Sequence, residues 1–389
     1  MEILFENVRS PGGYPCDELA SALQKFIRRG MTEEAARVAY ELARTSEEVR
    51  EYLWKRLIVI SVEDVGLGDP MAPVLIYCLN ETRKAYIDVP GEFGMFFVHA
   101  VRYLCGCRKE RGSCNLAQVM ARRIRRGDPI AFPDYVYDKH TVQGIRMGRG
   151  HRHFMDVSSQ VIPDVSGEAA LAWRRELYRM TLEEDEARGC PVDPDTPVEY
   201  ADVRSVHGYP MDLCVAALQK HIRRGETEPA VRVAFEMAMT SPYFYEWMWK
   251  RLRLISVEDV CFGEPQAQIV VHTLDRIRRE FYQDGGIHPM YFTHAIRYLC
   301  QCGKERGSCD LEHVLERRIA RGEMPVRLPD YVLDKHTARG QDMGRGEVHF
   351  LEHGAVVEPP FPTADGDYAE ELLAFALSLI HISEPTRLD

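Results

Sequence analysis

The sequence lacks the features that define several large classes of protein. No apolar run approaches the 18 residues that a membrane-spanning helix needs. The N-terminus has no basic segment followed by a long apolar one, so we expect no secretory signal peptide. The P-loop motif G-x-x-x-x-G-K-[ST] is missing, as are G-x-S-x-G, H-E-x-x-H and an EF-hand loop. These absences favour a non-catalytic protein without a cofactor, located in the cytoplasm.

Composition narrows the choice further. The net charge is −11, from 49 Lys and Arg against 60 Asp and Glu. That balance excludes a generic basic coat for nucleic acid, although local basic patches remain open. The 389 residues, 45% of them hydrophobic, suit two domains that each bury a core. Eleven cysteines are an odd number in a long chain, so we expect reduced thiols rather than a disulfide framework.

One unit is written twice in the chain. The segment WKRLIVISVEDVGLGDP at 54–70 recurs as WKRLRLISVEDVCFGEP at 249–265. Further matches keep an offset of 195 up to Arg126, and the offset is 196 from Pro133 onward. A repeat of this length predicts two tandem homologous domains rather than a solenoid of short units.

The domain plan follows from the repeat and from the Pro- and Asp-rich boundary near 190–203. We predict a first domain at 1–195 with its core at 13–126 and a loop at 127–165, a second domain at 196–376 with its core at 208–321 and a loop at 322–366, and a tail at 377–389. The tail resembles the translation of a sequencing-library adapter. We therefore expect that the natural sequence was cut near Ala376 and that the source is a raw, metagenomic assembly.

Each core is predicted to be helical, which makes the expected fold class all-α. In 17–29, Leu23 and Ile27 lie on one apolar stripe, and Gly30 is expected to end that helix. Thr32 is expected to cap the next helix. Alternation with a period of two is scarce, so an extensive sheet is not expected. The loop at 127–165, which follows the first core, has little periodicity and many Gly, Pro and His residues.

A third helix, expected at 48–61, is apolar nearly all round and is therefore predicted to be buried. Charges on such a helix must be paired. A pair of carboxylates can also serve as general acid and base, but nothing nucleophilic lies beside these ones in the sequence. We interpret the group as a structural ion-pair network, whose members are Arg56, Glu63 and Asp64, repeated as Arg251, Glu258 and Asp259.

The cysteines of both copies form the pattern C-x-C-x₆-C. Zinc sites prefer C-x₂₋₄-C knuckles, and two cysteines two positions apart on a helix point in nearly opposite directions. We therefore expect small buried thiols and no metal. The residues concerned are Cys105, Cys107 and Cys114, with Cys300, Cys302 and Cys309.

Two groups of basic residues also recur. Lys25, Arg28 and Arg29 end the first helix, with Lys220, Arg223 and Arg224 in the second copy, and cations there complement the helix dipole. A denser cluster can form an anion-binding rim or simply a solvated face. This cluster consists of Arg122, Arg123, Arg125 and Arg126, with Arg317, Arg318 and Arg321 in the second copy, and the binding candidates among them are Arg122, Arg123, Arg126, Arg317 and Arg318.

The most specific motif is the loop signature D-K-H-T-x-x-G-x-x-M-G-R-G-x-x-H-F. Glycine allows close approach to a ligand and Lys and Arg attract phosphate, which predicts a phosphate or nucleic-acid site. The same polar groups can instead pin the loop to its own domain. A metal at Asp138, His140 and His153 is a third option. The phosphate-binding candidates are Lys139, His140 and Arg149, with Lys335, His336 and Arg345.

The two cores resemble the C-terminal helical domain of MgsA/RarA-type AAA+ ATPases, which are relatives of clamp loaders. The resemblance covers about 13–126 and 208–321 and centres on WKRLIVISVEDVGLGDP. It implies a collar-type helical fold that drives oligomerisation beside DNA in replication or recombination repair. It supplies no catalytic residues, and the ATPase module of the family is absent here.

These observations lead to two main hypotheses, with a purely structural interaction protein as a third possibility. The first is a non-catalytic oligomerisation and DNA-binding accessory protein that self-associates as a homodimer of pseudo-symmetric repeats, or binds a related AAA+ ATPase. The second is an enzyme or binding protein for a phosphorylated small molecule or a nucleotide, which uses the loop signature. A pocket that converges on Lys139, His140 and Arg149 would favour the second hypothesis.

Overall fold

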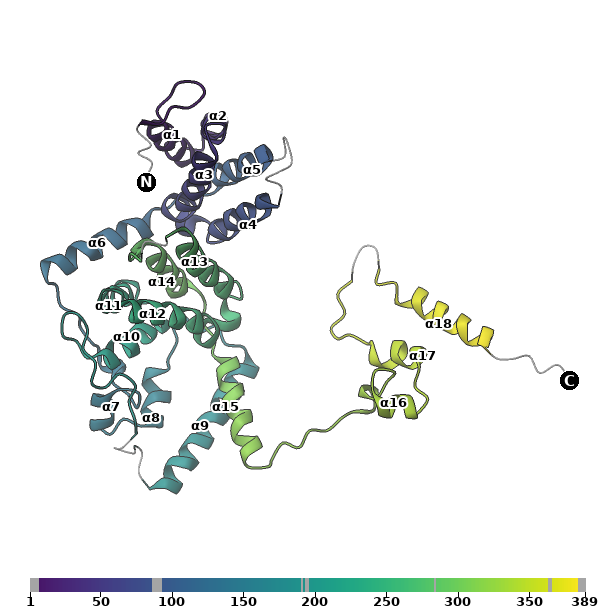
Figure 1. The fold of residues 1–389 in the computed structure, drawn as a ribbon. Coiled ribbons are helices and arrows are strands. Elements are labelled where there is room, and N and C mark those ends of the chain that lie inside the picture. The colour runs from purple at the N-terminus through teal and green to yellow at the C-terminus, as the bar shows by residue number, and fades with distance from the viewer. Residues whose placement is uncertain are drawn as a thin grey trace. The chain divides into compact units, whose positions relative to one another are not determined.

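The structure is a computed structural model that describes residues 7–85, 93–189, 192, 196–282, 285–362 and 366–383. These residues form helices joined by turns and loops, with isolated backbone bridges in place of strands (Figure 1). The all-α prediction is confirmed over this part of the chain. None of the helices described combines the length and the apolar character needed to cross a membrane.

The helices of the first core follow the predicted order. They are α1 (Cys16–Arg28), α2 (Thr32–Ala43), α3 (Glu47–Ile60), α4 (Ala72–Lys84), α5 (Phe93–Gly106) and α6 (Gly112–Arg126). A π-helical turn, η2 (Ser61–Val65), extends α3. Trp54 and Leu57 of α3 are almost completely buried, which agrees with a central helix.

The second core gives the same order of elements. Its helices are α10 (Met211–Arg223), α11 (Thr227–Thr240), α12 (Pro242–Ile255), α13 (Ala267–Phe281), α14 (Pro289–Gln301) and α15 (Gly307–Ala320). The π-helical turn η6 (Ser256–Val260) extends α12 at the position that η2 has after α3.

The expected helix signals near residue 30 are partly met. Gly30 follows α1 with a φ of +71°, the left-handed conformation that glycine adopts without a steric cost. The prediction that Thr32 caps α2 is wrong, because Thr32 is the first helical residue. The capping position belongs to Met31, whose side chain offers no acceptor to the exposed N–H groups.

The loop after the first core, residues 127–165, which we call loop 1, contains short helical elements. They are η4 (Asp134–Val136), α7 (Val142–Arg146), α8 (His151–His153) and η5 (Phe154–Ser158). The longer helix α9 (Glu168–Arg188) follows. Residues 190, 191 and 193–195 of the predicted domain boundary lie outside the described residues.

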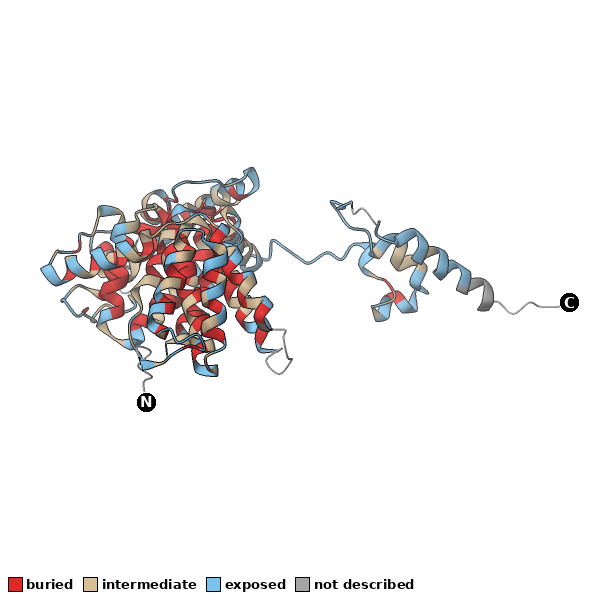
Figure 2. Cartoon of the chain, turned by 90° about the horizontal axis from the view of Figure 1, so that it is seen from above, coloured by how far each residue is buried: buried red, intermediate tan, exposed pale blue. Residues whose placement is uncertain are grey.

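The chain divides into two compact units, Met1–Glu316 and Arg317–Asp389. Most buried residues belong to the first unit, and the second is largely exposed (Figure 2). The second unit contains residues 322–366, which we call loop 2. The elements of loop 2 are η8 (Asp330–Val332), α16 (Ala338–Asp342), α17 (Glu347–His349) and η9 (Phe350–Gly354), and the helix α18 (Ala369–Ser383) follows it. Residues 384–389 of the predicted tail are outside the described part.

Within the first unit the two cores pack against each other, α6 along α14 and α4 along α13. Polar groups cross the first of these contacts. The hydroxyl of Ser113 lies 3.1 Å from Nδ1 of His294, which is completely buried. Arg297 donates to both carboxylate oxygens of Glu110 at 2.9 Å. The cores therefore share one continuous interior.

Candidate functional site

Loop 1 is held in shape by its own signature residues. The Thr141 hydroxyl donates to the carbonyl of Asp138 and accepts from the amide of Gly144, so Thr141 caps the N-terminus of α7. A Cβ atom on Gly144 would lie 2.0 Å from the Asp138 carbonyl oxygen, so only glycine fits there. The Asp-x-x-Thr-x-x-Gly spacing is thus explained by local backbone geometry.

Arg149, a predicted phosphate ligand, is used inside the loop. Its guanidinium donates to the carbonyls of Asp134 at 2.7 Å and Tyr137 at 3.0 Å, and it pairs with the Asp134 carboxylate. Arg345 repeats these contacts in loop 2 with Asp330 and Leu333. The geometry therefore favours a role in which these two arginines hold their own loops in shape over a role in binding phosphate.

Loop 1 docks on α10 of the second core. The Lys220 ammonium lies 2.7 Å from the Asp138 carboxylate and donates to the Val136 carbonyl at 2.7 Å. The amide of Val142 donates to the Asp212 carboxylate at 2.9 Å. These contacts join residues 70 or more positions apart in the sequence.

The end of loop 1 continues this contact through the backbone. The Ile162 amide donates to the Arg223 carbonyl at 2.6 Å, and the Val165 amide donates to the Lys304 carbonyl at 2.9 Å. Lys304 is fully buried beneath the loop. The guanidinium of Arg224 lies over the ring of Tyr135, 3.8 Å from its centroid.

Burial changes the acidity of the docking groups. Burial lowers the pKa of Lys220 to about 8, although the Asp138 carboxylate opposes the shift. Burial acts against ionisation of Asp138, but hydrogen bonding to His140 and the charge of Lys220 outweigh it and lower the pKa of Asp138. The ion pair therefore forms at neutral pH, with a lysine that can lose its proton in mildly alkaline solution.

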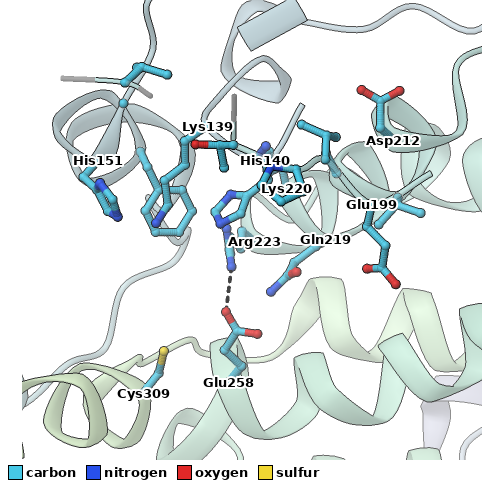
Figure 3. A pocket seen from close by; sticks show the side chains of 18 of the residues that line it. Lys139, His140, His151, Glu199, Asp212, Gln219, Lys220, Arg223, Glu258 and Cys309 are labelled. Atoms are coloured by element: carbon cyan, nitrogen blue, oxygen red, sulfur yellow. Dashed lines mark hydrogen bonds and ion pairs between the residues drawn. The ribbon is translucent and has the colours of Figure 1, made fainter. Parts of the chain in front are cut away.

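A cavity of about 730 Å³ lies between docked loop 1 and helices of the second core. Figure 3 shows Lys139 and His140 on the loop side and Glu258 and Cys309 on the opposite wall. Among the described residues, six Lys and Arg residues line the cavity against three Asp and Glu residues. The basic residues are Lys139, Arg188, Lys220, Arg223, Arg251 and Arg306, and the acidic ones are Glu199, Asp212 and Glu258.

The wall opposite the loop contains part of the predicted ion-pair network. Arg223 pairs with Glu258 at 3.0 Å and with Asp259 at 2.7 Å, and Arg306 pairs with the same two carboxylates. The Nε atoms of Arg251 and Arg306 are buried and have no hydrogen-bond partner among the described residues. The matching Arg56 and Arg111 of the first core have the same buried Nε atoms, so this feature belongs to the network in both copies.

The matching network of the first core lies outside the lining of this cavity. Asp64 and Glu63 pair with Arg28 and Arg111, and the Gln24 amide donates to Asp64 at 2.7 Å. Arg56 reaches this network by donating to the side-chain oxygen of Gln24. The sequence analysis did not include Arg28, Arg111, Arg223 and Arg306 in the network.

No nucleophile or metal centre accompanies the cavity among the described residues. Burial raises the pKa of the Cys309 thiol to about 11, against the opposing charge of Arg306, so the thiol is protonated at neutral pH. The described part of the chain has no group of three or more His, Cys, Asp or Glu side chains arranged to hold a metal ion. Asp138 and His140 contact each other instead, 3.3 Å apart.

The predicted arginine rim lies apart from the cavity lining. Arg123 pairs with Glu228 at 2.6 Å, and Arg126 pairs with Asp128. Arg122 donates to the Gln118 carbonyl of its own helix. Arg317 and Arg318 lie in the last turn of α15.

The remaining candidates lie in loop 2. Lys335 pairs with Glu347, and His336 lies 3.3 Å from Asp334. The structure therefore brings Lys139 and His140 to a cavity, while it uses Arg149 and Arg345 to hold their own loops.

Sequence reasoning did not assign two buried basic residues, Lys220 and Arg223, to the site. Lys220 and Arg223 were interpreted as last-turn cations that complement a helix dipole. Their burial comes from loop 1, which a helical pattern does not reveal. The available signal was that both copies keep Lys and Arg at these positions.

Comparison with known proteins adds no assignment: the chain matches no protein-family model and no curated protein.

Proposed function

We propose that this protein binds a phosphate-bearing small molecule, such as a nucleotide, in the cavity between loop 1 and the second core. The observation that carries the proposal is the surplus of basic over acidic groups among the described residues that line the cavity. Charge-assisted hydrogen bonds from guanidinium groups suit phosphate oxygens, which accept two bonds from one arginine. The volume of about 730 Å³ also falls within the range of small-molecule sites.

The basic residues of the two walls define where the anion binds. Arg251 lines the wall opposite loop 1, and its guanidinium lies 5.0 Å from the ring centroid of Trp247. It forms no ion pair among the described residues, so it can donate to an anionic oxygen in the cavity. Lys220 and Lys139 face the same space from the opposite side.

The site supports binding rather than catalysis. A protonated Cys309 is a poor nucleophile, and the Glu258 carboxylate is already paired with two arginines. The roles in DNA replication or repair, the association with an AAA+ ATPase and the cytoplasmic location stay predictions. Arg123 and Arg126, which were expected to contact DNA, are already paired with carboxylates.

Isothermal titration calorimetry with pyrophosphate and with ATP tests the proposal. Arg251→Met retains most of the side-chain length and removes the guanidinium, so affinity should fall about tenfold or more. Arg253→Met is the matched control, because Arg253 lies on the same helix, α12, and outside the cavity lining. Equal affinity of both variants would overturn the proposal, as would no binding by the unmodified chain.

The pH dependence gives a second readout. Affinity should fall between pH 7 and pH 9, because Lys220, with a pKa of about 8, loses its charge in this interval. Duplex DNA in a parallel titration separates the two hypotheses of the sequence analysis. Tight DNA binding that Arg251→Met leaves unchanged would place function outside the cavity.

A further inference from the structure

The contact between the two cores is of the head-to-tail type. Ser113 and Glu110 of the first core meet His294 and Arg297 of the second. A closed two-fold pair would also bury the reciprocal residues. Instead His99, Arg102 and Ser308, which match His294, Arg297 and Ser113, are exposed. The two cores therefore make this contact only in one direction. The matching surfaces, with His99 and Arg102 on α5 and Ser308 on α15, are exposed.

The first open surface lies on α1 and α5 of the first core. Asp17, Lys25 and Arg29 are exposed, whereas the matching Asp212 and Lys220 are buried beneath loop 1 and Arg224 is half-buried. Lys25 contacts Ser21 of its own helix. Both copies have thus kept the residues to which loop 1 docks, but only one copy carries a docked loop in the first unit.

The second open surface is loop 2. Its apolar residues Val326, Leu328 and Val357 are 87%, 65% and 66% exposed. Their counterparts in loop 1 are Ile130, Phe132 and Val161, of which Ile130 and Val161 are 9% and 7% exposed. Exposed apolar residues clustered in one segment indicate a surface that another part of a protein covers.

The polar residues of loop 2 match those of loop 1 that dock. Asp334 holds the amide and ring of His336 as Asp138 holds those of His140, so the two loops share their local shape. Tyr331 has the position in loop 2 that Tyr135 has in loop 1, and it is 57% exposed. Several docking contacts of loop 1 use backbone atoms, which side-chain differences between the copies do not remove.

We propose that loop 2 of one chain docks on α1 of a second copy of this chain, as loop 1 docks on α10. Asp334 would pair with Lys25 of the other copy, and Arg29 would lie over the ring of Tyr331. The same association would place Ser308 of the first chain against His99 of the second copy, as Ser113 lies against His294 between the two cores. Because this contact is head-to-tail, it produces rings or longer chains of copies rather than a two-fold dimer.

Association would also create a second cavity. The residues of the first core that match the cavity wall are Arg28, Arg56, Glu63, Arg111 and Cys114. Docked loop 2 would supply Lys335 and His336 opposite them. The assembly itself does not depend on the proposed ligand, because its contacts are between protein groups.

Analytical ultracentrifugation of the full chain without ligand tests the proposal. The unmodified chain should form species larger than a dimer as its concentration rises. Lys25→Glu reverses an exposed charge on the receiving surface, and Tyr331→Glu places a charge in the docking loop. Each variant alone should remain a monomer. Lys250→Glu changes an exposed lysine of α12 and should assemble like the unmodified chain.

A mixture of the two variants gives the sharpest result. The Lys25→Glu chain retains an intact loop 2, and the Tyr331→Glu chain retains an intact α1 surface. Their mixture should therefore form a dimer with one copy of each and nothing larger. A monomeric unmodified chain at 100 µM (about 10⁻⁴ M, a concentration at which weak specific contacts are populated) would overturn the proposal. Assembly of either variant like the unmodified chain would do the same.

Discussion

The first helices of the two cores have nearly the same sequence, ALQKFIRRG against ALQKHIRRG, and very different surroundings. Lys25 of α1 is exposed, whereas Lys220 of α10 is buried against Asp138. His99 of α5 is exposed, whereas His294 of α14 is completely buried. The comparison shows that the environment of a residue here depends on which segment docks on it, and that local sequence does not determine this.

The largest expected effect is on stability, and it distinguishes Asp138 of loop 1 from the matching Asp334 of loop 2. Asp138→Asn keeps the shape of the side chain and leaves the buried Lys220 without its carboxylate, which should reduce the free energy of unfolding by about 3–5 kcal/mol. Asp334→Asn should cost about 1 kcal/mol or less, since that carboxylate contacts only groups of its own loop in the described contacts. Urea unfolding of dilute protein measures both. Similar losses for the two variants would remove the distinction between the loops.

The two histidines give the next effect. Burial lowers the pKa of His294 to about 4, so the unfolded chain binds a proton that the folded chain rejects between about pH 6.5 and 4. Stability is therefore full above pH 6.5 and falls as the pH drops toward 4, by about 3 kcal/mol at pH 4 from this group.

His294→Gln should flatten this part of the pH profile, and His99→Gln, at the matching exposed position, is the control variant. Urea midpoints at pH 7, 5.5 and 4.5 provide the measurement. The same slope in His294→Gln and in the unmodified chain would show that His294 titrates normally.

The smallest effect concerns a backbone difference between the copies. Gly66 and Cys261 match each other, and both have a positive φ, +55° and +49°. A non-glycine residue in this conformation is strained, so Cys261→Gly should raise stability by up to about 1 kcal/mol. Thermal unfolding of this variant measures the gain. A lower melting temperature would mean that the 3.0 Å contact of the Cys261 sulfur with Ser308 outweighs the strain.

Local sequence predicted much of the fold because helices are local structures. The stripe that includes Leu23 and Ile27, and the glycine at position 30, define α1 to within a residue. The D-K-H-T signature also has a local explanation in the Asp138–Thr141–Gly144 turn. Such features depend on residues a few positions apart, which periodicity and turn chemistry describe well.

The candidate site was less predictable, because it depends on contacts between distant segments. Lys220 lies 82 positions from Asp138, and no pattern along either segment shows that they meet. Arg149 was expected to bind phosphate, but the carbonyls of Asp134 and Tyr137 were available to it locally. Retention of a residue in both copies showed that it matters and did not show whether it binds a ligand, the loop or another chain.

The most direct test of the difference between the loops is hydrogen–deuterium exchange on dilute Lys25→Glu chain, which should remain a monomer. We predict slow exchange at the amides of Val142, Ile162 and Val165, which are hydrogen-bonded to the second core. The matching amides of Ala338, Glu358 and Phe361 in loop 2 should exchange quickly. Equal protection of the two sets would contradict the account, because it would mean that both loops are docked, or neither, within a single chain.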